Sequence, residues 1–186
     1  MEADVIQSPG TPPDRPGSRP DRPSGPSGVT ELFRDHHLEL VRLALLVVGD
    51  LATAEDVVQD AFEQLHRRWH ALRRQSSALD YARATVLNRC RSVHRRRGVA
   101  RRYEPVLVAP ASQASDATAA IEQRSELFVA FGKLPTRQRE VLALRYYLDL
   151  SVTDTASTLR ISESAVRSTG SRGLAALARI LHGEEG

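Results

Sequence analysis

The side chains best suited to binding chemistry are the arginines and one asparagine that lie within residues 77–102. Asn88, Arg91 and Arg95 recur at spacings of three and four, so a helix would place them on one face. No acidic residue occurs between Tyr81 and Tyr103. Guanidinium groups suit phosphate and base-edge contact, and this face therefore predicts a nucleic-acid partner. A solvated helix end is the alternative, although aspartate and glutamate usually share such an end.

The other side of the same stretch is apolar and is expected to be buried. Its stripe consists of Leu79, Ala82, Val86, Cys90 and Val93. Gly98 follows, and glycine commonly ends helices because it accepts the left-handed conformation. The stretch is therefore predicted to be one helix that ends near residue 98.

A second stretch carries acidic rather than basic chemistry. Its polar side contains Asp56, Gln59, Asp60 and Glu63, and its apolar side contains Val57, Val58, Ala61, Phe62 and Leu65. Thr53 is predicted to open this helix in a capping box with Asp56. No lysine or arginine occurs from Leu51 to His66. This acidic face indicates a basic protein surface as its partner, since DNA would repel it. A merely solvated face is the alternative.

The third candidate site is a short helix, a brief turn and a longer helix near the C-terminus. Ser151 and Asp154 form a capping box, Arg160-Ile161 is the turn, and Ser162 caps a helix to about Leu181. This order is typical of a helix-turn-helix that reads the major groove. The residues expected to face DNA are Ser162, Ser164, Arg167, Ser168, Ser171 and Arg172. A helical packing module that binds no DNA would have a similar pattern.

The elements that must position these faces are helical throughout. The chain has 186 residues, with 41% hydrophobic and 5% aromatic content, which favours an all-α fold over a sheet. Further helices are expected over Val29–Val48 (capped by Thr30, and either continuous or broken near its middle), Ser125–Gly132 and Thr136–Leu148.

The spacing of these helices predicts two small domains, at residues 29–98 and 125–182. A flexible linker, residues 99–124, would join them. Residues 1–28 hold seven of the ten prolines and are expected to be a disordered tail.

Several classes of function lack their motifs. Cys90 is the single cysteine and has no CxxC partner, and His36-His37 is an isolated pair, so no metal site or cofactor is expected. GxxxxGK[ST] is absent. The aliphatic run Leu43–Val48 is far shorter than the ~20 residues that a membrane span needs. No signal peptide is visible. We therefore expect a cytoplasmic protein without membrane insertion and without enzymatic activity of its own.

Two motifs resemble a known family. TAEDVVQDAFEQLHRRW resembles the core-polymerase-binding helix in region 2 of bacterial sigma factors. KLPTRQREVLALRYYLDLSVTDTASTLRISESAVRSTGSRGLAAL resembles their region 4. The order and small size are similar to the extracytoplasmic-function group of the sigma-70 superfamily, which keeps only these two domains. The resemblance covers about residues 29–98 and 125–182.

The resemblance implies roles and partners. Asp56, Gln59 and Asp60 would bind core RNA polymerase. Arg83, Asn88, Arg91 and Arg95 would contact the minus-ten element of promoter DNA, and residues 73–80 would form the loop that captures a flipped base. The last helix would read the minus-thirty-five element. An anti-sigma factor is a further partner that the family admits.

Three residues depart from the family pattern. Arg160 stands where glycine is common in the turn, and we predict a positive backbone dihedral there. Thr155 stands where an aliphatic core residue is usual. Gly170 interrupts the recognition helix, where glycine costs up to ~1 kcal/mol relative to alanine.

Two other functions compete with the sigma-factor interpretation. A stand-alone helix-turn-helix regulator would explain residues 125–182 but would leave the acidic helix and Asn88 without a role. A helical adaptor that binds only protein would predict no promoter specificity.

Overall fold

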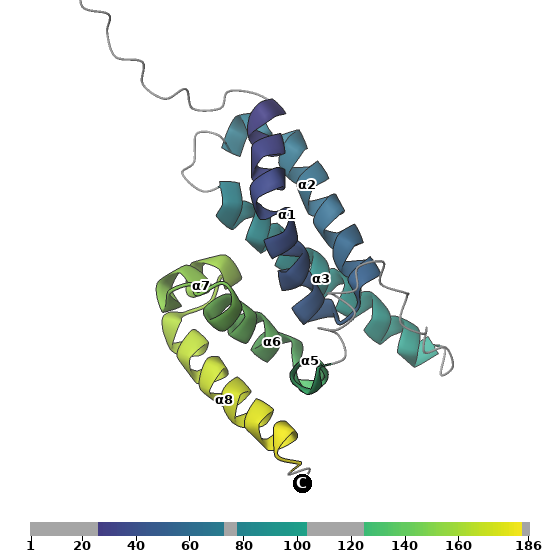
Figure 1. Cartoon of the computed structure of the whole chain (residues 1–186), viewed down its shortest axis with the longest axis vertical. Helices are drawn as coiled ribbons and strands as arrows, with labels where there is room; N and C mark the ends of the chain where they lie inside the picture. The colour runs from purple at the N-terminus through teal and green to yellow at the C-terminus, as the bar shows by residue number, and fades with distance from the viewer. Residues whose placement is uncertain (1–25, 73–77, 104–124, 184–186) are drawn as a thin grey trace, which may run out of the picture.

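The computed structural model describes residues 26–72, 78–103 and 125–183, and within these ranges every regular element is helical (Figure 1). The predicted all-α fold is therefore confirmed. Most of the predicted tail (1–28) and of the predicted linker (99–124) lies outside the described residues, but residues 26–28 belong to α1 and residues 99–103 to α3. The elements are α1 (Pro26–Val48), α2 (Leu51–Leu72), α3 (Ala78–Tyr103), α5 (Glu126–Lys133), α6 (Thr136–Leu142), η1 (Ala143–Tyr147), α7 (Val152–Leu159) and α8 (Glu163–Leu181).

Helices α1, α2 and α3 pack against one another as an N-terminal unit. Their apolar stripes meet in a core, with Leu40, Leu43, Leu65 and Leu87 fully buried. Trp69 is also buried and packs beside the start of α1, where a β-carbon on Gly28 would lie 2.4 Å from its ring. Helix α1 is continuous, so the alternative of a break near its middle is wrong.

The turn between α1 and α2 is capped differently from the prediction. Helix α2 begins at Leu51, and the amide of Thr53 donates a 2.9 Å hydrogen bond to the carboxylate of Asp50. Asp50, not Thr53, therefore caps this helix. Gly49 adopts φ 88°, a conformation that glycine reaches without steric cost.

Helix α3 is longer than expected. It passes through Gly98 and continues to Tyr103, so the prediction that Gly98 ends the helix is wrong. A β-carbon at this position would have open space. Glycine tolerates both helical and left-handed backbone, and its presence alone therefore cannot locate a helix end.

The C-terminal unit comprises α5, α6, η1, α7 and α8. The hydroxyls of Ser125, Ser151 and Ser162 accept hydrogen bonds from the first turns of α5, α7 and α8, and the last two confirm predicted caps. The expected helix over 136–148 is divided: α6 ends at Leu142, the π-helix η1 follows over Ala143–Tyr147, and Leu148 lies beyond it. The main buried side chains of this unit include Leu144, Val141, Leu159 and Val166.

The two units contact each other through α1 and α3 on one side and α5, α6, η1 and α7 on the other (Figure 1). Their buried apolar residues belong to one continuous cluster, from Val29 to Val166. The described helices thus form a closed arrangement in which the predicted nucleic-acid face of α3 lies beside the C-terminal unit.

Candidate protein and nucleic-acid interfaces

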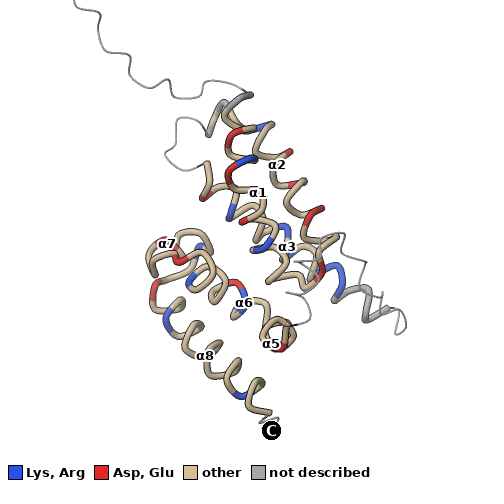
Figure 2. The backbone as a smooth tube through the Cα atoms, viewed as in Figure 1, with Lys and Arg blue, Asp and Glu red and all other residues tan. Residues whose placement is uncertain are grey.

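The polar face of α2 is arranged as its periodicity predicts. Asp56, Gln59 and Asp60 are exposed, while Val57 and Val58 beside them are buried. The other acidic residues of α2, whose positions are red in Figure 2, are also exposed. This side can bind a partner without disturbing the core, because its residues contribute almost nothing to core packing.

The α2 face is not purely acidic in three dimensions. Asp56, Gln59 and Asp60 line a groove of about 580 Å³, whose other wall is α3 and includes Arg89, Arg96 and Arg97. The guanidinium of Arg89 donates to the Asp60 carboxylate at 3.1 Å. The sequence analysis predicted separate partners for the acidic and basic helices. This ion pair could not be predicted from helical spacing, because the two residues are 29 positions apart.

Arg97, at the same end of α3, fixes the α1–α2 turn. Its guanidinium donates to Asp50 at 2.7 Å, to the Thr53 hydroxyl at 2.8 Å and to the Val48 carbonyl at 3.2 Å. Burial raises the pKa of Asp50, but the hydrogen bonds from Thr53 and Arg97 outweigh it, so the pKa lies below its usual value. Arg97 is therefore a structural arginine, although composition alone groups it with its neighbours.

The four α3 residues predicted to contact DNA occupy different environments. Asn88 and Arg95 are exposed. Arg91 instead grips Glu140 of α6 in a two-pronged ion pair, with Nε 2.6 Å from Oε1 and Nη2 3.0 Å from Oε2. Its Nη1 also donates to the Asn88 side-chain oxygen at 2.9 Å. The structure thus brings Asn88 and Arg91 together, but it turns Arg91 toward the other unit.

Arg83 is held inside the N-terminal unit. Its side chain is 12% exposed, and its guanidinium donates twice to Glu39 of α1, at 2.8 and 3.2 Å. It therefore offers little surface to a nucleic acid and chiefly ties α3 to α1. Residues 73–77, most of the predicted base-capturing loop, lie outside the described residues.

Two further groups of α3, one buried and one half-buried, contact the interior of the protein. Cys90 is fully buried, and burial, reinforced by Glu140, raises the pKa of its thiol to about 12. The imidazole of His94 donates from Nε2 to the Val47 carbonyl at 2.9 Å. Burial, with the nearby Arg139 and Arg97, holds the pKa of His94 below its usual value despite the hydrogen bond to Val47. Neither group is placed for surface chemistry.

The predicted DNA face of α8 lies on the surface of the C-terminal unit. Its six residues, Ser162, Ser164, Arg167, Ser168, Ser171 and Arg172, are all exposed. Val166, Gly170 and Gly173 are buried on the opposite side. The helix-turn-helix arrangement therefore leaves a small-residue, arginine-bearing face open over its whole length.

The three departures from the family pattern have distinct structural consequences. Arg160 adopts φ 53° and ψ 53°, which confirms the predicted positive dihedral. Thr155 is fully buried, and within the described residues its hydroxyl has no hydrogen-bond partner. A β-carbon on Gly170 would meet Val141 at 3.6 Å, an ordinary contact, so packing does not require this glycine.

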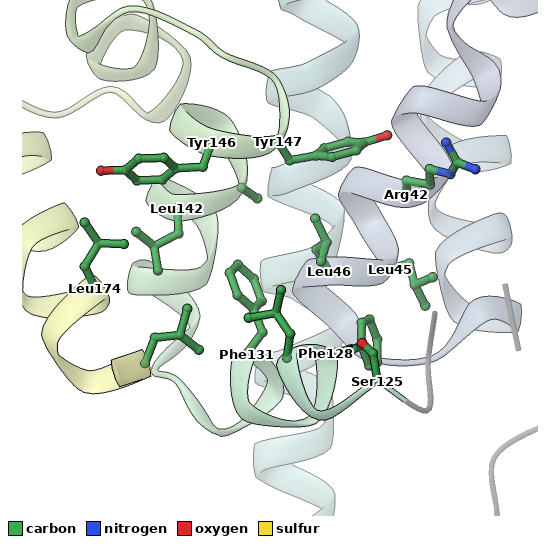
Figure 3. A pocket seen from close by; sticks show the side chains of 13 residues that line it. Arg42, Leu45, Leu46, Ser125, Phe128, Phe131, Leu142, Tyr146, Tyr147 and Leu174 are labelled. Carbon is green, nitrogen blue, oxygen red and sulfur yellow. Dashed lines mark hydrogen bonds between the residues drawn. The ribbon is translucent and has the colours of Figure 1, made fainter. Parts of the chain in front are cut away.

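An apolar groove that the sequence did not predict runs between the two units (Figure 3). It encloses about 600 Å³ and is lined by α1, α5, α6, η1 and α8. The side chains around it include Leu45, Leu46, Phe128, Phe131, Tyr146, Tyr147 and Leu174. Tyr146 is 63% exposed and Leu127 is 55% exposed, so much apolar surface remains uncovered.

Within residues 26–72, 78–103 and 125–183, no cluster of three or more histidine, cysteine, aspartate or glutamate side chains could hold a metal ion. No helix in these ranges has the length and hydropathy needed to span a membrane.

The described helices form a two-unit protein with a helix-turn-helix in its C-terminal unit. Residues 32–102 match the family described as Sigma-70 region 2, and residues 124–177 match Sigma-70, region 4. The chain belongs to the sigma-70 family and is an RNA polymerase sigma factor of the extracytoplasmic-function type.

Curated relatives are similar over most of their length. The ECF RNA polymerase sigma factor SigM of Mycobacterium tuberculosis (strain H37Rv) is 31% identical over 151 residues, which cover 81% of this chain and 76% of the relative. The RNA polymerase sigma-E factor of Streptomyces coelicolor is 32% identical over 149 residues, which cover 79% and 82%.

Solved structures share the fold. The sigma factor RpoE of Bartonella quintana, in complex with the anti-sigma factor NepR, has a TM-score of 0.68 and 20% identity, covering 84% of this chain and 98% of that chain. CnrH, in complex with the cytosolic domain of CnrY, has a TM-score of 0.63 and 23% identity, covering 87% and 92%.

Proposed function

We propose that this sigma factor binds core RNA polymerase through the polar face of α2 and contacts promoter DNA through α3 and α8. It acts as an initiation factor, without catalytic chemistry of its own. The proposal assigns Asp56, Gln59 and Asp60 to the polymerase. It assigns Asn88, Arg91 and Arg95 to the minus-ten element and the exposed face of α8 to the minus-thirty-five element.

The observation that carries this proposal is the separation of roles on α2. Asp56, Gln59 and Asp60 are exposed, whereas the other side of the helix is almost completely buried. These exposed side chains contribute little to core packing and are available for a partner, although Asp60 also pairs with Arg89. Carboxylates complement a basic protein surface and repel DNA. A stand-alone DNA-binding regulator would give this face no role.

The two DNA faces support different steps. Small hydroxyl side chains on α8 permit close approach to a major groove, while Arg167 and Arg172 can reach phosphates or guanine edges. Asn88 and Arg95 are exposed on α3, and such a cationic track suits an unstacked single strand. Arg83 is better explained as a positioning residue, because Glu39 already holds its guanidinium.

An anti-sigma factor is included among the proposed partners. The groove between the units is apolar, with Tyr146 and Leu174 on its rim. An exposed apolar groove of this kind commonly binds another protein. One structural neighbour was solved with the anti-sigma factor NepR.

The decisive experiment removes the acidic pair on α2. Asp56→Ala/Asp60→Ala should change unfolding free energy by no more than ~0.5 kcal/mol, because both side chains are exposed. Loss of desolvated charge pairs with polymerase should weaken core binding by about 2–5 kcal/mol. The measurement is capture of core RNA polymerase across a salt series, with circular dichroism to establish folding.

A matched control is available on the same helix. Glu55→Ala/Glu63→Ala removes the same charge from two exposed positions to which no role is assigned. This control should bind core as the wild type does. If both double variants retain wild-type capture, or lose it equally, the specific role of Asp56 and Asp60 is refuted.

A further inference from the structure

One polar contact joins the two units at the residue proposed to touch the minus-ten element. Arg91 on α3 and Glu140 on α6 lie 49 positions apart in sequence, and their side chains form a bidentate ion pair. The Glu140 side chain is 1% exposed, and the Arg91 side chain is 34% exposed. The prong of Arg91 that does not reach Glu140 is taken by Asn88.

The Arg91 guanidinium already donates hydrogen bonds within the chain, and these compete with hydrogen bonds to DNA. Its Nε and Nη2 donate to Glu140 and its Nη1 donates to the Asn88 oxygen, so each of its three nitrogens already has a partner. A guanidinium binds a phosphate or a base edge most strongly through two parallel N–H groups, and Glu140 occupies the Nε–Nη2 edge of Arg91 in this way. The contact with Glu140 and a bidentate contact of that edge with DNA therefore exclude each other.

The same carboxylate anchors the C-terminal side. Arg137 donates to Glu140 Oε2 at 2.9 Å and to the Leu159 carbonyl at 3.4 Å. Glu140 therefore stays paired with Arg137 when Arg91 moves away. Separation of the two units leaves no unpaired buried carboxylate. Desolvation offsets much of the attraction in buried ion pairs, so such a contact sets the relative position of the units at little net gain in stability.

Packing elsewhere between the units is incomplete. The apolar groove of about 600 Å³ lies between α1 and the C-terminal unit, and Leu127, Tyr146 and Leu174 remain exposed. An interface that leaves an open groove of this size is less densely packed than a protein interior. The closed arrangement can therefore open without the cost of breaking a fully packed core.

We propose that Glu140 is an autoinhibitory latch that competes with promoter DNA for Arg91. In the closed chain the carboxylate occupies the guanidinium that the minus-ten element needs. DNA that binds only the open chain shifts the population toward it, and closure lowers DNA affinity by the same linkage. This proposal rests on the proposed role of Arg91 in minus-ten contact.

The test uses the full chain without polymerase, in three variants. Glu140→Gln keeps the shape of the latch but removes its charge. Arg91→Gln breaks the same contact from the other side and also removes the DNA ligand. Glu63→Gln is the control, since it removes a carboxylate from an exposed pair with Arg67 within α2.

Two readouts are measured for each variant. Fluorescence energy transfer between dyes at Ala52→Cys on α2 and Ala178→Cys on α8 reports the separation of the units; both positions are exposed, whereas Cys90 is buried and escapes labelling. Anisotropy of short, labelled, random-sequence single-stranded DNA reports affinity.

Glu140→Gln should lower energy transfer and tighten DNA binding. If the open fraction in the wild type is about one tenth, the gain in affinity is at most about tenfold, because apparent affinity scales with the competent fraction. Arg91→Gln should lower energy transfer equally but weaken DNA binding. Single-stranded DNA should also lower energy transfer in the wild type, a measurement that needs no latch variant to fold.

Each failure identifies its source. Wild-type energy transfer in folded Glu140→Gln, or no change on adding saturating DNA to the wild type, overturns the latch. An opened Glu140→Gln chain with unchanged DNA affinity overturns the competition. In either case the affinity of Arg91→Gln relative to Glu140→Gln decides the proposed function separately, because both variants lack the ion pair and equal affinities mean that Arg91 does not bind DNA.

Discussion

The arginines of α3 and of α8 are supported in opposite ways. On α3, Arg83 pairs with Glu39 and Arg91 with Glu140, partners that lie 44 and 49 positions away. On α8, Arg167 donates to Glu163 and Arg172 to the Ser168 carbonyl, each four positions away in the same helix. One face is held by the tertiary structure, whereas the other is organised by its own helix.

The two faces therefore differ in whether the units must move before the face can bind DNA. The α8 face needs no rearrangement to meet a DNA duplex, because its contacts travel with the helix. The α3 face is bound up with the relative position of the two units, and Arg91 becomes available only when α6 moves away. On the proposed assignments, such a factor would expose its minus-thirty-five surface on α8 while Glu140 still occupies part of its minus-ten surface on α3.

The largest effect that would test this contrast is on α8. Arg167→Ala/Arg172→Ala should weaken minus-thirty-five contact in the polymerase complex by about 1–3 kcal/mol for each arginine that reads a base. An arginine that contacts only phosphate should instead reduce the salt slope by about one. The measurement is binding of the assembled complex to promoter duplex across a salt series.

Two comparisons make that measurement specific. Arg179→Ala removes a positive charge from an exposed position near the C-terminal end of α8 and should have little effect. The double variant should also keep the wild-type energy transfer between α2 and α8, because neither arginine touches the N-terminal unit. An equal loss of DNA binding in Arg179→Ala would reduce the α8 face to general electrostatic attraction.

A smaller effect should appear on the α3 side as pH falls. His94 is half-buried, donates to the Val47 carbonyl and lies near Arg97, Arg139 and Glu140, and burial first and the arginines next lower its pKa. Above the ordinary histidine pKa of about 6.5, the imidazole is neutral in both folded and unfolded chains. Below it, the imidazole takes up a proton more readily in the unfolded chain than in the folded chain. The free energy of unfolding therefore decreases as the pH falls.

The expected slope is at most about 1.4 kcal/mol per pH unit for one proton. His94→Gln should remove that part of the decline while retaining a donor for Val47. His66→Gln, on the exposed side of α2, controls for the chemical change. Urea unfolding from pH 7.5 downward measures both variants; identical pH profiles for wild type and His94→Gln would exclude this histidine as the source.

The sequence predicts the α8 face better than the α3 face, because the contacts of α8 are local and those of α3 are tertiary. The α8 face, its Ser162 cap and its buried Val166 side follow from helical periodicity and local hydrogen bonding, and the structure has them as expected. The exposed positions of α2 follow in the same way. These features depend on residues within one or two helical turns, which a sequence pattern records directly.

The pairing of α3 could not be predicted in this way. Nothing near Glu140 in the sequence identifies Arg91 as its partner, and nothing near Glu39 identifies Arg83. Composition therefore grouped Arg83, Arg91 and Arg97 as one basic surface, whereas packing gave each a different carboxylate. The passage of α3 through Gly98 and the π-helix that follows α6 were not predicted either. Glycine is compatible with a helix interior as well as with a helix end, so Gly98 could not locate the end of α3.

The smallest expected effect lies in the turn before α8. Arg160 is exposed and adopts φ 53°, which strains a residue that carries a β-carbon. Glycine relieves a strain of about 1–2 kcal/mol. Glycine also raises the conformational entropy of the unfolded chain, which lowers the free energy of unfolding by about 0.4–1 kcal/mol. Arg160→Gly should therefore raise the unfolding free energy by a few tenths to ~1 kcal/mol.

Arg160→Ala provides the discriminating control, since it removes the guanidinium but keeps the β-carbon. If strain governs the turn, the glycine variant should melt above both the alanine variant and the wild type in thermal unfolding of the full chain. A lower melting temperature for glycine would mean that the Arg160 side chain contributes more than its backbone costs. The α8 unit would then depend on a side-chain contact in this turn, and its organisation would be less local than the contrast with α3 implies.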